Sequence, residues 1–338
     1  MFALFDEHEA ILMPTPGFEL LSHAIEMRSS IRCVFADTEH LKDQFASASI
    51  PELLAAFEDA INGALAQGLT VRAIFLCNPH NPLGRCYEPS VLRAIMAFCE
   101  TRGLHLVVDE IYALSASEGR FHSTLTVSGT AATNVHVLYG PGKDWGLCGA
   151  RLGCLITRNH ELLRTLEQTA RFTRASSLAE ELLLSIFSDH EYTDSVHIPA
   201  LRKRLSLARA CVMQRLTELE IPFVEPHASF GIWIDLQRYL RFFCQNSSAS
   251  REAQLARYLL SRGVLLMPSD VSSSQRHWFQ SINPGLTMVE AFHTNDRGAF
   301  RLNYAVDAEM LRNGMDRFER ALGELKVTHR PRAKRLSK

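Results

Sequence analysis

The sequence lacks the features that mark membrane and nucleic-acid-binding proteins. Its 338 residues carry 36 Lys and Arg against 37 Asp and Glu, so no excess of positive charge is available for nucleic acid or a membrane surface. No apolar run is long enough to cross a bilayer. The start of the chain has Asp6, Glu7 and Glu9 in place of the basic residues of a secretory signal. We therefore expect neither a nucleic-acid nor a membrane partner.

The cysteines show no pattern typical of a metal site or a disulfide framework. The chain has eight cysteines, with no CxxC pair and no Cys/His spacing typical of zinc. We expect reduced thiols, a cytoplasmic location and no metal. The composition, 46% hydrophobic and 22% charged, is that of an ordinary globular protein, and the length suffices for two packed units.

Strands and helices alternate in the first half of the chain. Apolar runs predict strands, and 3.6-residue periodicity with Pro and Gly boundaries predicts helices. The expected strands are 10–13, 31–35, 71–77, 104–108, 135–139 and 153–157, and the expected helices are 18–27, 51–66 and 89–101. This alternation predicts an α/β fold with a doubly wound, mostly parallel sheet.

The pattern changes after Asn159 and indicates a smaller α+β C-terminal domain. The expected elements are helices at 160–190, 198–220, 251–262 and 308–322, strands at 230–235, 264–267 and 300–304, and a Ser-rich loop at 268–298. We predict a large domain over 1–158, a helical connection and small domain over 159–325, and a basic tail over 326–338.

Polar residues follow three successive strands of the predicted sheet. Asn81 follows the strand 71–77, Asp109 and Tyr112 follow 104–108, and Lys143 follows 135–139 after the break Gly140-Pro-Gly142. The carboxyl ends of parallel strands meet at one edge of a sheet, which is where ligands bind in such folds. A lysine that forms an imine, a carboxylate for a ring nitrogen and donors for a ring oxygen are what an electron-sink pyridine cofactor requires.

Each of these residues also has an ordinary structural explanation. Asn81 alone is typical of a turn, Asp109 alone of a helix cap, and Lys143 alone of a solvated surface lysine. Their joint occurrence at three successive strand ends favours a site over three separate coincidences.

Three ordered motifs resemble a known family. Asn78-Pro-His-Asn-Pro-Leu-Gly84, Asp109-Glu-Ile-Tyr112 and Lys143-Asp-Trp-Gly-Leu-Cys-Gly-Ala-Arg-Leu-Gly153 are similar to motifs of the fold type I pyridoxal-phosphate enzymes. The match is best with the class I/II aminotransferases and their 1-aminocyclopropane-1-carboxylate synthase-like branch. The resemblance runs from about Phe5 to Leu322 and implies pyridoxal 5'-phosphate as cofactor, with a large domain that binds it.

The resemblance assigns the cofactor ring to four residues. It makes Lys143 the Schiff-base lysine and proton shuttle, and it pairs Asp109 with the ring nitrogen. Tyr112 and Asn81 are expected to bond the ring oxygen.

The same resemblance assigns the phosphate, the ring face and the substrate. Arg151 is expected to contact the phosphate, Phe18 to stack on the ring, and Arg301 to grip the α-carboxylate of the substrate as a bidentate fork. The family has a serine where this chain has Gly140, and a serine or threonine where it has Gly142. The phosphate contacts are therefore expected to rest on Arg151 and on backbone N–H groups.

The resemblance implies an aminotransferase that acts on an α-amino acid and forms a homodimer. A carbon–sulfur lyase, similar to relatives in fungal secondary metabolism, and an elimination or cyclisation enzyme of the 1-aminocyclopropane-1-carboxylate synthase type remain alternatives. The family places a Gly-Ala-rich turn ahead of the position of Ala10, and no such turn stands upstream of Met13. We therefore expect an N-terminally incomplete large domain, and an inactive paralogue that acts as a binding partner is an alternative from another class.

Overall fold

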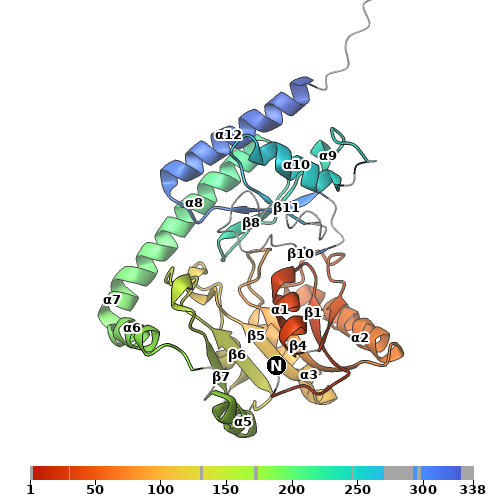
Figure 1. Cartoon of the computed structure of the whole chain (residues 1–338), viewed down its shortest axis with the longest axis vertical. Coiled ribbons are helices and arrows are strands. Elements are labelled where there is room, and N and C mark those ends of the chain that lie inside the picture. The colour runs from red at the N-terminus through yellow and green to blue at the C-terminus, as the bar shows by residue number, and fades with distance from the viewer. Residues whose placement is uncertain are drawn as a thin grey trace, which may run out of the picture.

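A six-stranded sheet forms the lower half of the molecule (Figure 1). The computed structural model describes residues 3–29, 31–129, 132–170, 174–245, 247, 249–269, 292–294 and 298–328. The strands are β1 (Glu9–Pro14), β3 (Arg32–Ala36), β4 (Thr70–Cys77), β5 (His105–Asp109), β6 (Val135–Tyr139) and β7 (Cys154–Thr157). They lie in the order β3-β1-β4-β5-β6-β7, and all neighbours are parallel except β6 and β7. The α/β fold with a mostly parallel sheet is thus confirmed.

Helices cover both faces of this sheet. They are α1 (Glu19–Ser29), α2 (Ile50–Ala66), α3 (Pro89–Arg102) and α4 (Thr124–Ser128), with short turns η1 (Ser47–Ser49), η2 (Ala113–Ser115) and η3 (Cys148–Ala150). The apolar run of β5 shows why both faces are covered. Leu106 and Val108 pack into the core shared with α2 and α3, whereas Val107 points into the opposite core with Ile25 of α1. Side chains alternate across a strand, so a continuous apolar run requires two cores.

The second half of the chain begins with helices that lead into a three-stranded antiparallel sheet, β8-β11-β9 (Figure 1). Its elements are α5 (His160–Ala170), α6 (Ser177–Ser188), α7 (His190–Tyr192), η4 (Thr193–His197), α8 (Ile198–Glu218), β8 (Gly231–Asp235), α9 (Gln237–Leu240), α10 (Arg251–Leu260), β9 (Met267–Pro268), β11 (Ala299–Asn303) and α12 (Ala308–Thr328). A separate apolar core lies between this sheet and α8, α10 and α12. The two-residue strands β2 (Gly17–Phe18) and β10 (Phe292–His293) pair with each other.

Some predicted boundaries were wrong for identifiable reasons. The helix expected over 160–190 is two helices, because Ser176 takes an extended N-cap conformation (φ −64°, ψ 133°) before α6. The strand expected at 264–267 is reduced to β9, which pairs with β11 at two positions. Helix α12 runs to Thr328, three residues into the expected tail, because Leu325 is buried in the second core.

Two expectations concern residues that the structure does not describe. Most of the predicted loop 268–298 and the tail from 329 onward lie outside the described residues. In the part of the chain that is described, no helix combines the length and apolar character of a membrane span.

Candidate active site

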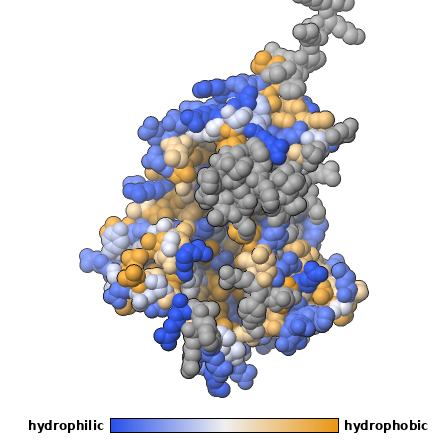
Figure 2. Space-filling model, in the orientation of Figure 1, coloured by the Kyte–Doolittle hydropathy of each residue, from blue (hydrophilic) through white to orange (hydrophobic). Residues whose placement is uncertain are grey.

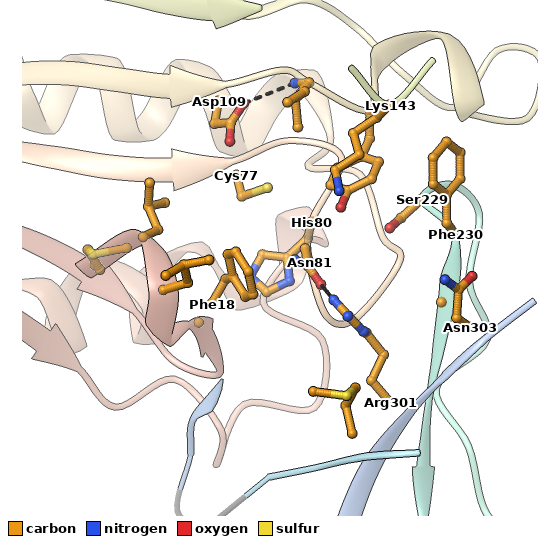
Figure 3. Close-up of a pocket in the computed structure, with 18 of the residues that line it drawn as sticks. Phe18, Cys77, His80, Asn81, Asp109, Lys143, Ser229, Phe230, Arg301 and Asn303 are labelled. Atoms are coloured by element: carbon orange, nitrogen blue, oxygen red, sulfur yellow. Dashed lines mark hydrogen bonds between the residues drawn. The ribbon is translucent and has the colours of Figure 1, made fainter. Parts of the chain in front are cut away.

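A cavity of about 560 Å³ lies where the strands β4, β5 and β6 end, facing the sheet β8-β11-β9 (Figure 3). Its volume falls in the usual range for small-molecule sites. Both halves of the chain line it, and the lining includes six of the seven residues expected at the site: Phe18, Asn81, Asp109, Tyr112, Lys143 and Arg301.

The loop after β4 is fixed by its own polar groups. Asn78 is fully buried, and its side-chain oxygen accepts a hydrogen bond from the Tyr87 N–H (3.1 Å). Gly84 has φ +66°, and a Cβ there would lie 2.6 Å from the Cβ of Pro226. Glycine at 84 therefore allows this loop to pack against the segment before β8, where Ser229 and Phe230 line the cavity.

Asp109 is a half-buried carboxyl at the carboxyl end of β5. One carboxylate oxygen accepts a hydrogen bond from the Ile111 N–H (3.0 Å), drawn as a dashed line in Figure 3. Burial raises the pKa of Asp109 to about 6, although the Ile111 N–H and the charge of Lys143 oppose the shift. A cation placed beside this carboxyl would favour its ionised form and lower its pKa.

Substitution of Asp109 by asparagine should stabilise the ligand-free protein at neutral pH. The pKa of an unfolded aspartate is about 3.9, whereas that of Asp109 is raised to about 6 in the folded state. The folded state therefore binds the proton more tightly, and its free energy of unfolding falls as pH rises from about 4 to about 6. We expect Asp109→Asn to be more stable by on the order of 2 kcal/mol at pH 7.5. Urea unfolding of both proteins measures this difference in the free energy of unfolding.

The same experiment contains its own control in pH. At pH 3.5 both proteins carry a neutral side chain at this position, so their free energies of unfolding should agree. Asp144, whose pKa burial raises to about 7, titrates in both proteins and cancels in the difference. If the free energies of unfolding of the two proteins changed with pH in parallel, ionisation of Asp109 would not lower the stability of the folded state.

Lys143 and Tyr112 enter the cavity from neighbouring loops. The Lys143 Nζ lies 5.9 Å from the centroid of the Tyr112 ring. Tyr112 is also in edge contact with Phe230, with 5.4 Å between ring centroids. Figure 3 shows Lys143 reaching into the cavity between Asp109 and Phe230. The expected convergence of strand-end residues is thus present in the geometry.

Asp144 does not line the cavity, but it supports the Lys143 turn and was missed from the sequence. It is buried beside Lys143, and one carboxylate oxygen accepts a hydrogen bond from the Leu114 N–H (2.9 Å). The Asp144 carbonyl accepts another from His197 Nε2 (3.0 Å), whose ring stacks on Trp145 at 3.9 Å. Asp144 therefore ties the Lys143 turn to the loop that carries Tyr112. The only signal in the sequence was its position next to Lys143.

Arg301 lies on β11 at the opposite side of the cavity from Asp109 (Figure 3). Its Nη1 donates a hydrogen bond to the Asn81 side-chain oxygen (2.8 Å), and its guanidinium carbon lies 5.1 Å from the Phe292 ring centroid. A Cβ at Gly231 would lie 2.9 Å from the Arg301 Cγ. Glycine at 231, also missed from the sequence, leaves the room that the stem of Arg301 occupies.

Phe18 and Arg151 differ in placement. Phe18 lines the cavity, with its ring 6.2 Å from that of Phe292. Arg151 follows η3 in a left-handed conformation (φ 51°) and is exposed, and its Nη1 donates a hydrogen bond to the Cys148 carbonyl (3.3 Å). It is not among the described residues that line the cavity. The structure therefore does not bring Arg151 together with the other six.

The donor set fits the ring and the aldehyde of a pyridine-aldehyde cofactor. The cavity offers an amine at Lys143 that could hold an aldehyde, a half-buried carboxyl at Asp109 that could pair with a ring nitrogen, and polar groups at Asn81 and Tyr112 that could bond a ring oxygen. Arg301 is a second cation that lines the cavity, and a guanidinium matches a carboxylate in geometry. Among the described residues, no group of three or more His, Cys, Asp or Glu is placed to hold a metal ion.

Comparison with known proteins gives one family over nearly the whole chain. The sequence model of the family described as "Aminotransferase class I and II" matches residues 1–318. The chain is 29% identical over 326 residues to the cattle protein named 1-aminocyclopropane-1-carboxylate synthase-like protein 1, covering 94% of this chain and 59% of that protein. It is also 29% identical to the mouse protein named probable inactive 1-aminocyclopropane-1-carboxylate synthase-like protein 2, covering 96% and 52%.

Solved structures show the same fold. An aromatic aminotransferase from Pyrococcus horikoshii OT3 superposes with a TM-score of 0.74 at 20% identity, covering 96% of this chain and 76% of that one. This likeness supports the fold alone. The chain spans between half and three fifths of the length of the two curated relatives above.

Proposed function

The chain belongs to the aminotransferase class I and II family, and from that premise we propose that it is an aminotransferase that acts on an α-amino acid. Its cofactor is pyridoxal 5'-phosphate. What supports the proposal most is the convergence of Asn81, Asp109 and Lys143 from three adjacent strands on one cavity with Arg301 on its far side.

Each of the cavity residues has a separate proposed role toward the cofactor. When bound, pyridoxal phosphate supplies the electron sink that stabilises negative charge on the α-carbon of the substrate. In our proposal Lys143 holds the aldehyde carbon and then moves the α-proton. Asp109 keeps the ring nitrogen protonated, and the positive charge of that nitrogen favours the ionised form of Asp109. Asn81 and Tyr112 donate to the ring oxygen.

The remaining assignments concern the phosphate, the ring face and the substrate. We propose that Phe18 stacks on the ring and that Arg301 binds the α-carboxylate as a fork. Arg151 remains our proposed phosphate contact, and its guanidinium would have to leave the Cys148 carbonyl to make it. Backbone N–H groups of the turn after β6 would add to that contact.

A lyase is the second candidate, because the same residues would serve carbon–sulfur cleavage or the elimination and cyclisation of a 1-aminocyclopropane-1-carboxylate synthase. The name of the cattle relative supports the synthase reaction. Product analysis separates the two reactions. Protein loaded with cofactor and one amino acid should yield the 2-oxo acid and aminated cofactor in equal amounts if it is an aminotransferase. Release of ammonia or a thiol, or formation of a cyclic amino acid, with the cofactor unchanged, would contradict the proposal in favour of the second candidate.

An inactive paralogue is the candidate from another class. The name of the mouse relative supports it, as do the glycines at 140 and 142 where the family has hydroxyl side chains. In that case the chain would act as a binding partner, and neither product would form with any amino acid.

The two glycines before Lys143 should respond differently to a restored hydroxyl. A Cβ at Gly140 would lie 3.0 Å from the Leu152 carbonyl oxygen, whereas a Cβ at Gly142 would make ordinary contacts of 3.6–3.9 Å with Cys148. We expect Gly142→Ser to tighten cofactor binding about fivefold through one hydrogen bond. Gly140→Ser should lower the free energy of unfolding by about 1–3 kcal/mol through crowding.

Cofactor titration followed by absorbance, and urea unfolding, measure both effects. Gly142→Ala is the matched control, because it adds the Cβ without the hydroxyl. Equal affinities for Gly142→Ser and Gly142→Ala would show that this turn does not reach the phosphate.

We also propose a homodimer in the cytoplasm. Large apolar side chains of α6 are exposed, including Leu178 (82%) and Leu184 (60%), together with Phe187. Figure 2 shows apolar atoms gathered at the lower left, where Figure 1 places α6 and α7. Such a patch is typical of an interface. Sedimentation should show that the wild type is a dimer and that Leu184→Glu weakens this dimer. A monomeric wild type would contradict the proposed dimer.

All eight cysteines are free thiols, which fits the proposed cytoplasmic location, because the cytoplasm is a reducing compartment.

A further inference from the structure

Resting on the proposed function, we infer that Asp144 is a positioning residue, whose carboxyl holds Lys143 and Tyr112 in the relative placement that the cofactor requires. Asp144 does not line the cavity. It acts through Lys143, its neighbour in the chain, and through the loop that carries Tyr112.

The loop that carries Tyr112 is held by two charged side chains from distant segments. The Leu114 N–H donates a hydrogen bond to the Asp144 carboxylate (2.9 Å), and the Leu114 carbonyl accepts one from Arg202 Nε of α8 (3.2 Å). The N–H and the hydroxyl of Ser115 both donate to the Tyr112 carbonyl, at 3.1 and 2.5 Å. These bonds join Tyr112 to the segment that Asp144 holds, so a shift of that segment would also move Tyr112.

The Asp144 carboxyl is buried inside the chain. The residue is 1% exposed. Its Oδ2 accepts the hydrogen bond from Leu114, whereas its Oδ1 is buried and makes no hydrogen bond within the described part of the chain. A carboxylate in such a place loses hydration without full compensation. Burial accordingly raises the pKa of Asp144 to about 7.

Other titratable groups pack against Asp144. The Tyr139 hydroxyl, at the end of β6, and the Arg202 guanidinium favour its ionised form, but burial outweighs both. The Asp144 carbonyl accepts a hydrogen bond from His197 Nε2, and Lys143 precedes it in the chain. All of these groups remain when asparagine replaces Asp144. Their own titration therefore cancels in a comparison of the two proteins, which isolates the charge of Asp144.

Ionisation of Asp144 should weaken the binding of the cofactor. The carboxyl is neutral below about pH 7 and ionised above it. The phosphate of the cofactor carries about −1.5 to −2 charges at neutral pH. In the proposed function this anion is held by the residue next to Asp144, and two negative charges repel each other at short range in a partly buried site. The pH dependence of cofactor affinity should therefore depend on Asp144.

Three variants separate the hydrogen bond of Asp144 from its charge. Asp144→Asn keeps a carbonyl acceptor for Leu114, whereas Asp144→Ala removes both the acceptor and the charge. In cofactor titrations, Asp144→Asn should equal the wild type at pH 6 and bind about threefold more tightly than the wild type at pH 8.5. Asp144→Ala should bind about tenfold more weakly at pH 6. Asp59→Asn, which removes an exposed carboxylate of α2, is the matched control and should equal the wild type at both pH values.

Hydrogen exchange of the ligand-free protein gives a second readout that needs no cofactor. Within the described part of the chain the Leu114 N–H donates to Asp144 alone. At pH 6 this amide should exchange at least about fivefold faster in Asp144→Ala and at about the wild-type rate in Asp144→Asn. Exchange at the wild-type rate in Asp144→Ala would overturn the inference.

The titrations distinguish the inference from the function on which it rests. If the cofactor band forms but Asp144→Ala binds the cofactor like the wild type, only the inference fails. It also fails alone if the affinity of Asp144→Asn relative to the wild type is the same at both pH values. If the wild type forms no cofactor band, the proposed function and the inference fail together.

Discussion

Replacement of Lys143 by alanine is expected to abolish both the cofactor absorption band and all turnover. Lys143 is the lysine that lines the cavity, and it enters beside Tyr112 and opposite Arg301. In the proposed function, its removal takes away the nucleophile that holds the cofactor and the base that moves the α-proton. Loss of both contributions should lower activity by at least ~10⁴-fold. Absorbance at the edge of the visible range and product formation are the measurements.

Two controls define the result for Lys143. Lys203→Ala removes an exposed lysine of α8 and should leave the band unchanged. Lys143→Arg keeps the positive charge but is not expected to form the imine, so it should also lack the band. A band of wild-type intensity in Lys143→Ala would mean that another amine holds the cofactor.

Replacement of Arg301 by lysine should weaken substrate binding while leaving the cofactor band in place. Lysine keeps the charge but loses the fork that matches a carboxylate. Hydrogen bonds to a charged group contribute about 1.5–3 kcal/mol, so KM for the amino acid should rise on the order of 10–100-fold. Steady-state kinetics measure KM, and cofactor titration checks that pyridoxal phosphate still binds.

A second variant perturbs Arg301 without removing it. Gly231→Ala places a Cβ 2.9 Å from the Arg301 Cγ, so the stem must shift. We expect a smaller rise in KM than in Arg301→Lys and no change in the cofactor band. If both variants bound amino acids like the wild type, the α-carboxylate would have to be held elsewhere.

The sheet and most of the cavity followed from local sequence signals. Strand β6 spans the residues that its apolar run predicted, because Gly140-Pro-Gly142 ends it. Asn81, Asp109 and Lys143 converge because parallel strands place their carboxyl ends at one edge. Arg301 reaches the same cavity from a separate sheet, and its place between the apolar residues Phe300 and Leu302, together with the family resemblance, had indicated a ligand contact.

Other parts of the site depend on contacts between distant segments. Gly231 matters through the antiparallel pairing of β8 with β11, which no local pattern encodes. Asp144 acts through a hydrogen bond to Leu114, thirty residues away along the chain. The position of Arg151 follows from the left-handed turn after η3 and not from its spacing to Lys143. The sequence therefore predicted which chemistry is present better than which contacts hold it.

Mapping the covalent attachment of pyridoxal phosphate tests the central claim most directly. Protein loaded with the cofactor is treated with borohydride, which converts the carbon–nitrogen double bond into a stable single bond, and its peptides are analysed by mass spectrometry. A pyridoxyl phosphate group on the peptide that contains Lys143, in about one copy per chain, is the predicted result. A label on a different lysine, or no label at saturating cofactor, would contradict the assignment of this cavity as the cofactor site.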